Sequence, residues 1–397
     1  MIIHPQIQGV VARSCHPAGC QAAVNEQIDK ATQQHSQDTA LPKRVLILGA
    51  SSGFGLASRI ALTFGPANAK TLGVSFERGA SEKGIGSAGW YNNIHVANAA
   101  QAAGKVAPNI VGDAFSDKVR QQVAETIRNE FDGEVDLVVY SLATGVRPNP
   151  ENGEFWRSVI KPVGKAVEGY SVNFEHNRLD TIALPPASEQ EIDDTVKVMG
   201  GEDWLGWMEF LNDQQLLAKG CRTVAYSYIG PERTHDIYHK GTLGLAKIHL
   251  HQTRKDIDQL LAPLQGHADI AVCKALVTKA SVFIPGLTPY LLALYRVMKD
   301  KGIHEGCIEQ MNRLFYSKWN SDARDQEGLI RLDDWELRED VQQAVNPLLD
   351  TITPQNFNDL GDYDGVLREF LQLNGFAFEN VEYDAPVDID TLKALKP

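Results

Sequence analysis

The dominant pattern along the chain is a short apolar run, then a polar or glycine-rich turn, then a longer stretch with helical periodicity. The apolar runs are uninterrupted, which is typical of strands covered on both faces. The pattern predicts a weak strand at 106–111 and stronger strands at 44–48, 71–76, 135–140, 222–227 and 268–273. Helical patterns lie between them, near 53–65, 116–131, 203–218 and 244–262. This alternation predicts a Rossmann-like, doubly wound α/β fold with a mainly parallel sheet and right-handed crossovers.

Two stretches break this rhythm. Residues 144–200 hold many Pro, Gly and Asn residues, and they predict an inserted hairpin or irregular loops over one edge of the fold. Residues 303–375 have a helical pattern, apart from a turn-rich patch at 320–330. The tail from residue 376 onward predicts a short strand.

None of these stretches has the character of an independent domain. We therefore expect a single large α/β domain over residues 1–397. Its dinucleotide-binding core covers about 41–300, with the insertion at 144–200 and a C-terminal helical extension at 303–397.

A glycine-rich loop joins the first predicted strand to the helix that follows. Its residues are Gly49, Ala50, Ser51, Ser52, Gly53, Phe54 and Gly55. The first glycine permits the tight turn, the second lets the backbone approach a pyrophosphate, and the third lets the helix pack closely on the sheet. The helix N-terminus then offers free N–H groups to phosphates. The loop predicts a dinucleotide site, although glycines in this pattern also occur in purely structural turns.

Candidate cofactor contacts also lie at the ends of other strands. Phe76 and Glu77 end the second strand, where a carboxylate accepts hydrogen bonds from the adenosine ribose and repels a 2′-phosphate. This predicts NADH rather than NADPH, unless Glu77 is only a solvated strand-end residue or Arg78 weakens the discrimination. Asp113 either brackets the adenine together with Ala114 or caps the next helix.

The fourth strand ends in the small residues Ser141-Leu142-Ala143. Small side chains at this point would let the cofactor pass close to the backbone, so Leu142 and Ala143 are further candidates. On its own this signal is weak.

The fifth strand is followed by Tyr238 and Lys247, which form a candidate catalytic pair. A tyrosine hydroxyl can donate to a substrate oxygen, and a nearby lysine charge lowers its pKa. Nine residues on one continuous helix would put the two side chains on opposite faces. We therefore expect a break at 240–242, with Thr242 capping a helix that carries Lys247 in its first turns. The alternative is that Tyr238 belongs to the core and Lys247 is solvated.

Composition narrows the function classes. The chain is 43% hydrophobic and 22% charged, as expected of a folded globular protein. With a net charge of −13 and no basic run, nucleic-acid binding is not expected.

No apolar run approaches the roughly 20 residues of a membrane span. The five cysteines are scattered and do not form a disulfide framework, which together with the N-terminal sequence suggests a cytoplasmic protein. Cys15, His16 and Cys20 are too few ligands for structural zinc, so no metal site is predicted.

Taken together, these motifs resemble the FabV-type enoyl-ACP reductases and the closely similar trans-2-enoyl-CoA reductases. The resemblance covers essentially the whole chain. It is carried by the Tyr-x8-Lys spacing at 238 and 247 and by GASSGFG at 49–55, HPAGC at 16–20, GWYNN at 89–93, GDAFSD at 112–117, MGGEDW at 199–204 and HEGCIEQ at 304–310. One departure is Ile248, because some members carry a second lysine directly after the catalytic one.

The resemblance implies an NADH-dependent reduction of the carbon–carbon double bond of a trans-2-enoyl thioester in fatty acid synthesis. Tyr238 would be the proton donor or enolate stabiliser, Lys247 its cofactor-binding partner, and Tyr228 a contact of the thioester carbonyl. The implied NAD contacts are Gly49, Ala50, Ser51, Ser52, Gly53, Phe54, Phe76, Glu77, Asp113, Ala114, Leu142, Ala143, Lys247, Leu276, Val277 and Thr278. The family also implies a monomer.

Alternatives remain open at this stage. A carbonyl-reducing dehydrogenase of the short-chain type or a non-catalytic NAD-binding protein would carry similar motifs. The acyl carrier, either acyl carrier protein (ACP) or coenzyme A, is not specified. The basic residues Arg296, Lys299 and Lys301 could receive an acidic carrier protein or could simply be solvated.

Overall fold

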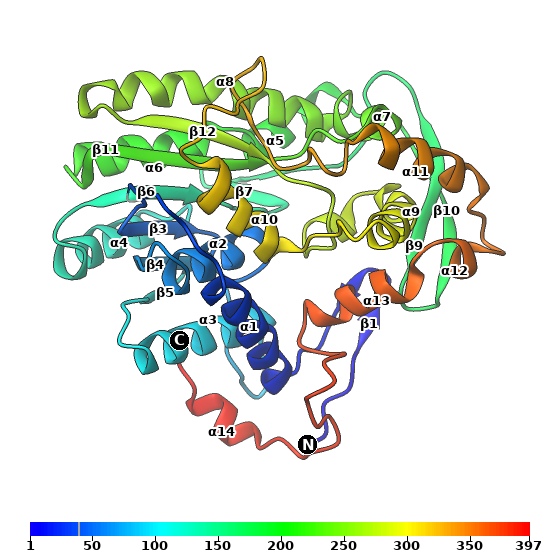
Figure 1. Ribbon diagram of the computed structural model, residues 1–397, viewed down its shortest axis with the longest axis horizontal. Helices are drawn as coiled ribbons and strands as arrows, with labels where there is room; N and C mark the ends of the chain where they lie inside the picture. The colour runs from blue at the N-terminus through cyan, green and yellow to red at the C-terminus, as the bar shows by residue number, and fades with distance from the viewer. Residues whose placement is uncertain (39) are drawn as a thin grey trace.

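The computed structural model describes residues 1–38 and 40–397, and its centre is a parallel β-sheet. Among the described residues the sheet has seven strands in the order β13-β12-β11-β6-β3-β4-β5, all paired in parallel (Figure 1). Their bounds are β3 Arg44–Leu48, β4 Lys70–Ser75, β5 Asn109–Val111, β6 Val135–Tyr140, β11 Leu217–Ser227, β12 His267–Val272 and β13 Ile330–Arg331. The predicted parallel sheet is confirmed.

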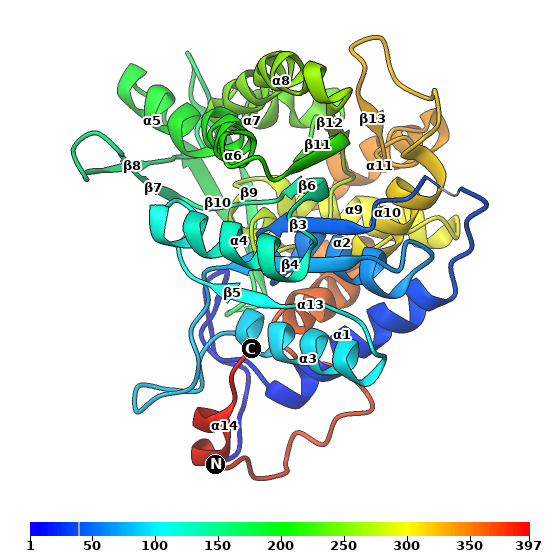
Figure 2. The same ribbon diagram turned by 90° about the vertical axis from the view of Figure 1, so that its left-hand side faces the viewer.

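Helices cover both faces of this sheet, so the doubly wound prediction is also confirmed. On one side lie α1 (Pro17–Thr32), α2 (Gly53–Phe64), α3 (Ala88–Ala102) and α10 (Cys307–Arg313). On the other lie α4 (Asp117–Glu130), α6 (Glu202–Asp213) and α8 (Thr242–Leu261). Figure 2 shows α6 and α8 above the sheet and α1 and α3 below it.

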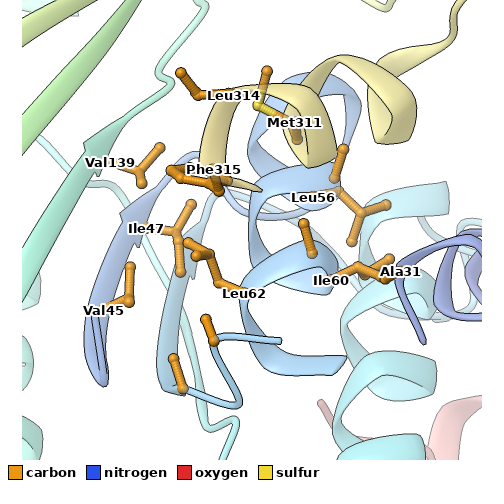
Figure 3. Packing of buried hydrophobic residues seen from close by; sticks show 14 of the residues in the cluster. Ala31, Val45, Ile47, Leu56, Ile60, Leu62, Val139, Met311, Leu314 and Phe315 are labelled. Atoms are coloured by element: carbon orange, nitrogen blue, oxygen red, sulfur yellow. The ribbon is translucent and has the colours of Figure 1, made fainter. Parts of the chain in front are cut away.

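Alternation along the central strand β3 explains why both faces are apolar. Val45 and Ile47 pack against α2 and α10, whereas Leu46 and Leu48 belong to the cluster on the opposite face. Figure 3 shows Val45 and Ile47 facing Phe315 and the side chains of α2. With apolar partners on both sides, an uninterrupted hydrophobic strand is the only pattern that avoids burying polar groups.

The insertion contains hairpins, as predicted, and one helix that was not. Its elements are β7 (Val146–Pro148), β8 (Phe155–Arg157), β9 (Val167–Asn173), β10 (Arg178–Leu184) and α5 (Glu189–Met199). A capping box begins α5, because the Ser188 hydroxyl accepts from the Glu191 backbone and the Glu191 carboxylate accepts from the Ser188 backbone.

The C-terminal extension is helical, but it also completes the sheet. Helix α9 (Leu287–Asp300) precedes the extension. Within the extension, α10 is followed by the π-helical turn η4 (Leu314–Lys318) and by the helices α11 (Glu339–Thr351), α12 (Phe357–Leu360), α13 (Tyr363–Gln372) and α14 (Ile389–Ala394). Strand β13 lies at the edge of the predicted turn-rich patch and pairs with β12. In Figure 1, α9, α11, α12 and α13 gather beside the β9–β10 hairpin at one end of the molecule.

Two sequence predictions about this framework were wrong. The tail from residue 376 forms no strand, because Phe376 and Tyr383 instead pack their rings around His16. The helix predicted at 203–218 ends at Asp213, since Gln215 adopts a left-handed φ of 57° and β11 starts two residues later.

The remaining elements are short or were not predicted. Helices α1 and α3 fall where no periodicity was recognised. The short elements are β1 (Ile7–Gln8), β2 (Val11–Ala12), η1 (Glu232–Thr234), α7 (His235–Tyr238), η2 (Ala262–Leu264) and η3 (Ser281–Phe283). Among the described residues, no helix has both the length and the apolar character required to cross a membrane.

Candidate active site

A cavity of about 220 Å³ opens at the carboxyl ends of β6, β11 and β12. Ligands bind at this edge in doubly wound folds. Of the residues proposed from the sequence, the cavity is lined by Phe54, Leu142, Ala143, Tyr228, Tyr238, Lys247, Leu276 and Thr278. Val277 lies in the loop after β12, and the other candidates, including the glycines of the loop, Glu77 and Asp113, lie along the neighbouring strand ends β3, β4 and β5.

The loop at 49–55 forms a concave backbone surface, here called the glycine cradle, in which side chains on Gly49 or Gly55 would clash. Gly49 has a φ of 90°, and a Cβ there would lie 2.3 Å from the Ser141 carbonyl oxygen. A Cβ on Gly55 would lie 2.0 Å from the Gly49 carbonyl oxygen, so α2 could not pack where it does. Ser52, the N-cap of α2, makes no side-chain capping bond, which leaves the first N–H groups of the helix available to phosphates. The loop therefore fits a dinucleotide.

Glu77 anchors the turn after β4 to the glycine loop. Its carboxylate accepts hydrogen bonds from the Ser51 hydroxyl at 2.7 Å and from the Ser87 hydroxyl. The half-buried carboxylate is thus held beside the cradle, and it is not a solvated strand-end charge. The adjacent Phe76 is 81% exposed and belongs to no hydrophobic cluster.

Asp113 does not cap the helix that follows it. Ser116 is the N-cap of α4 and accepts from the Val119 backbone, while Asp113 accepts from the Phe115 backbone at 2.9 Å. The capping alternative is therefore wrong. The turn at Asp113 leads into buried Ala114, which packs with the sheet.

The predicted chain break between Tyr238 and Lys247 is present. Helix α7 ends at Tyr238 and α8 begins at Thr242, with Gly241 as its N-cap. The prediction that Thr242 caps α8 is wrong, because its hydroxyl donates to the Val159 carbonyl at 2.6 Å and so ties the break to the insertion.

Tyr238 is buried without a hydrogen-bond partner. Its side chain is 4% exposed and lines the cavity, and its hydroxyl has no partner among the described residues. Burial and the nearby Glu336 carboxyl raise its pKa well above the ordinary value, so the hydroxyl keeps its proton. A buried hydroxyl without a partner costs free energy, and a ligand that accepts its proton would remove that cost.

Lys247 lies in the second turn of α8 and lines the same cavity. Its ammonium group donates to the Tyr226 carbonyl oxygen at 3.1 Å, which leaves two of its three protons for other acceptors. Burial lowers its pKa from 10.5 to about 8, against the smaller opposite effect of Cys273. Lys247 is therefore a cation that can bind ribose hydroxyls beside Tyr238.

The residues after β12 complete the cavity opposite the glycine loop. The Thr278 side chain would lie 3.8 Å from a Cβ on Gly53. The Ser281 hydroxyl donates to the Leu276 carbonyl at 2.6 Å, and the Val277 N–H donates to the Tyr295 hydroxyl at 2.9 Å. These bonds hold the loop rigidly over the place predicted for the cofactor.

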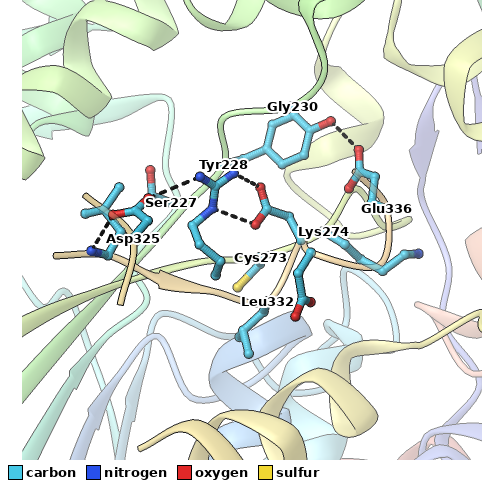
Figure 4. Close-up of polar contacts among 12 residues, drawn as sticks. Ser227, Tyr228, Gly230, Cys273, Lys274, Asp325, Leu332 and Glu336 are labelled. Carbon is cyan, nitrogen blue, oxygen red and sulfur yellow. Dashed lines mark hydrogen bonds and ion pairs between the residues drawn. The ribbon is translucent and has the colours of Figure 1, made fainter. Parts of the chain in front are cut away.

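Sequence reasoning missed the C-terminal extension as a source of site residues. Glu336, which lies in the turn between β13 and α11, is fully buried and accepts a hydrogen bond from the Tyr228 hydroxyl at 2.9 Å (Figure 4). The Tyr228 ring stands edge-on to the Tyr238 ring, with centroids 4.7 Å apart. Glu336 lies 108 residues from Tyr228 in the sequence, so no local motif connects them.

The three cations suggested for carrier docking have partners within the chain. Lys299 pairs with Asp362 at 2.6 Å and Lys301 with Asp340 at 2.9 Å. Arg296 donates to the Gly361 carbonyl at 3.0 Å. Carboxylates thus pair with Lys299 and Lys301, whereas Arg296 bonds to a carbonyl and keeps its charge, and the docking interpretation stays a prediction.

Comparisons with known proteins agree with this arrangement. Three family models match consecutive parts of the chain: the NAD(P)H binding domain of trans-2-enoyl-CoA reductase over 2–82, the trans-2-enoyl-CoA reductase catalytic region over 84–319, and an enoyl reductase FAD binding domain over 324–387.

Individual relatives are similar along their whole length. An enoyl-[acyl-carrier-protein] reductase [NADH] of Photobacterium profundum is 56% identical, and a trans-2-enoyl-CoA reductase [NADH] of Clostridium beijerinckii is 46% identical, each over 100% of both chains. The crystal structure of Clostridium acetobutulicum trans-2-enoyl-CoA reductase in complex with NADH superposes with a TM-score of 0.96, at 44% identity over 100% of both chains.

The third model names a flavin, which the residues here do not fit. All residues of 324–387 are described, and they form β13, α11, α12 and α13 without a strand, glycine loop and helix in succession. The buried Glu336 carboxylate is occupied by donors from the chain itself. The glycine cradle, the Tyr238–Lys247 pair and the full-length similarity agree instead, and this chain belongs to the FabV-type family of NADH-dependent enoyl-ACP and trans-2-enoyl-CoA reductases.

Proposed function

We propose that this protein reduces the carbon–carbon double bond of trans-2-enoyl thioesters, with NADH as the reductant and Tyr238 as the donor to the thioester oxygen. The observation that carries the proposal is the buried, unpartnered Tyr238 hydroxyl in the mainly apolar cavity that Lys247 also lines. A protein that only bound NAD would gain nothing from keeping such a group.

The residues that fit NADH lie along the strand ends. The glycine cradle and the N-terminus of α2 would hold the pyrophosphate, and Glu77 would accept from the adenosine ribose. Lys247 would bind the nicotinamide ribose. When bound, NADH supplies a hydride to the β-carbon of the substrate. The protein contributes position and electrostatics.

Tyr238 would stabilise the negative charge that forms on the substrate during the reaction. Hydride addition to the β-carbon turns the thioester carbonyl into an enolate, and negative charge builds on its oxygen. A hydroxyl in a dry cavity stabilises that oxygen more strongly than water does, because little of its field is screened. The Lys247 charge helps the hydroxyl to donate. The α-carbon is then protonated.

The acyl chain has an apolar place to lie. The same cavity is lined by Ile160, Met199, Leu243, Ile284 and Leu287, which come from the insertion, α8, the segment before α9 and the start of α9. Carbonyl reductases of polar substrates have no need for such a surface. ACP and coenzyme A thioesters both present this chain, so we propose either as the carrier.

We further propose that the enzyme works as a cytoplasmic monomer and that residues 1–397 act as one unit. In support of the single unit, the N- and C-terminal parts meet where the Val387 N–H donates to the Met1 carbonyl.

The reaction class is tested with two substrates that share one carrier. Purified protein should oxidise NADH with crotonyl-CoA and leave NADH unchanged with acetoacetyl-CoA, which offers a ketone but no conjugated double bond. Turnover of acetoacetyl-CoA alone would favour the short-chain carbonyl reductase. NADH binding without turnover of crotonyl-CoA or crotonyl-ACP would favour a non-catalytic protein. Comparing KM for the two crotonyl carriers would then settle the carrier.

A further inference from the structure

Tyr228 has a different hydrogen-bond state from Tyr238, although both hydroxyl groups line one cavity. A tyrosine carries one hydroxyl proton, and in this structure the Tyr228 proton is given to Glu336 Oε1. While that bond persists, Tyr228 can accept a hydrogen bond from a ligand but cannot donate one. The partner that holds its proton therefore decides whether Tyr228 can help to stabilise an enolate.

Glu336 is surrounded by donors from several elements. Its Oε1 also accepts from the Tyr290 hydroxyl of α9 at 2.8 Å, and its Oε2 accepts from the Ala275 N–H at 2.7 Å. The Tyr290 hydroxyl in turn accepts from the Gln342 amide at 3.1 Å. These bonds fix the carboxyl group to within one rotamer and connect the C-terminal extension to the loop after β12.

Few charges are close enough to Glu336 to influence it. Lys274, which is 2% exposed, follows β12 and gives its hydrogen bonds to backbone carbonyls, so its charge acts on Glu336 only at a distance. Asp333 on the same turn repels the carboxylate but is paired with Arg331. The other titratable groups facing it are the hydroxyls of Tyr228, Tyr238 and Tyr290. Burial dominates and raises the pKa of Glu336, so the neutral acid persists to a higher pH than in water.

The neutral acid would reverse the bond to Tyr228. The Ala275 N–H requires Oε2 as an acceptor, so the acidic proton belongs on Oε1. Tyr290 already accepts from Gln342, which leaves Tyr228 as the hydroxyl with an unused lone pair. Once Tyr228 accepts from Glu336, its own proton is free to turn into the cavity beside Tyr238.

We propose that Glu336 is a positioning residue that sets the direction of the Tyr228 hydroxyl, so that Tyr228 donates to the thioester oxygen only when Glu336 is the neutral acid. This inference rests on the proposed function. It assigns the C-terminal extension a part in the reaction. The protonation state of Glu336, and so the pH, would decide whether Tyr228 acts as a second hydrogen-bond donor to the enolate.

The test compares kcat for crotonyl-CoA in the natural protein and in Tyr228→Phe between pH 6 and pH 9. Groups that titrate in both proteins, Lys247 included, cancel in the ratio of the two kcat values. We expect the ratio to be about 10-fold or more at the acidic end, below the roughly 10²- to 10³-fold loss for a main oxyanion donor because Tyr238 remains, and to fall toward one as the pH rises. A ratio that does not change with pH overturns the proposal.

Two further variants separate this role from a merely structural one. Gln in place of Glu336 (Glu336→Gln) can keep its carbonyl on Ala275 and donate its amide to Tyr228, so in that background the Tyr228→Phe ratio should stay high at every pH. A ratio that still falls there would contradict the proposal.

Tyr290→Phe is the second variant, useful in case Glu336→Gln does not fold. Tyr290 does not line the cavity, but it donates to the ionised carboxylate. Its loss should therefore move the fall in the ratio to higher pH. An unmoved transition would overturn the proposal. If the natural protein turned over no enoyl thioester at all, the proposed function would fail first, which is a different result from a flat ratio.

Discussion

The two sides of the cavity differ in how their polar groups are satisfied. On the side formed by α7 and α8, the Tyr238 hydroxyl has no partner among the described residues and Lys247 makes a single hydrogen bond. On the side formed with the C-terminal extension, the hydroxyl protons of Tyr228 and Tyr290 are both given to Glu336, so these donors are saturated. A buried polar group without a partner raises the free energy of the free enzyme, and a substrate that bonds to it removes that cost. Groups whose donors are already paired instead hold the neighbouring side chains in place. We therefore expect large functional effects on the first side and smaller, conditional ones on the second.

The largest effect should come from Tyr238→Phe. The ring and its packing against Tyr228 would remain, while the one unpartnered donor is lost. Because that donor acts on charge present only in the transition state, kcat for crotonyl-CoA should fall about 10²- to 10³-fold with little change in KM for NADH. Steady-state rates with both substrates varied would measure this. A loss below 3-fold would mean that another group stabilises the enolate.

Lys247→Met should uncouple activity from stability. Burial depresses the Lys247 pKa to about 8, below its value in the unfolded chain, so at pH 7 folding works against the charged form. Removing the charge should stabilise the fold by about 1 to 2 kcal/mol at pH 7, after allowance for solvent access, while kcat falls about 10²-fold. Urea unfolding and steady-state kinetics would check the two parts. A destabilised variant would show that Lys247 is mainly structural.

The same residue predicts a pH profile. Lys247 loses its charge as the pH rises through about 8, so kcat/KM for NADH should decline above that pH. The folded pKa lies below the unfolded one, so the stability cost of burial should be present below pH 8 and should disappear as the pH rises toward 10.5. Activity and stability should thus change in opposite directions over this range. Lys247→Met should lack both trends, and their persistence would point to a different group.

The unpartnered side of the cavity is also the side that the sequence predicted well. Its parts are local: a strand, a glycine loop and a helix for the cradle, and a helix break that lets Tyr238 and Lys247 line one cavity. Such short-range features depend on dihedral angles and helix periodicity, which a sequence expresses directly. Thr242 was misassigned because its hydroxyl found a carbonyl in the distant insertion, which no local rule includes.

The saturated side could not be predicted. Glu336 follows a two-residue strand, too short to show any pattern, and its partners lie directly after β11, on α9 and in the loop after β12. An acidic residue in a polar turn is normally solvated. Only the tertiary fold shows that this one is buried. The strand predicted after residue 376 failed for a related reason, since the aromatic residues that pack around the distant His16 look in sequence like part of a strand.

A variant of Glu77 tests the cofactor site, where a carboxylate that already accepts two hydrogen bonds is expected to act through its charge. Glu77→Gln keeps the hydrogen bonds to Ser51 and Ser87 possible but removes the repulsion of a 2′-phosphate. The preference for NADH over NADPH, expressed as a ratio of kcat/KM values, should decrease about 10-fold, comparable to one close charge pair at the protein surface. Ser87→Ala, which keeps the charge, is the matched control. An unchanged ratio would mean that discrimination resides elsewhere.

The smallest effects should come from the cations outside the cavity. Lys299 and Lys301 are paired with Asp362 and Asp340, and exposed pairs of this kind contribute roughly 0 to 1 kcal/mol each. Replacing both lysines by Gln should therefore change stability by about 1 kcal/mol or less and leave KM for crotonyl-ACP and crotonyl-CoA equal to that of the natural protein. A selective rise in KM for crotonyl-ACP would show that a saturated surface cation can still dock a carrier. In that case, the rule that unpartnered groups matter more for function than saturated ones would hold only inside the dry cavity, where an unmet hydrogen bond costs more free energy than at the surface.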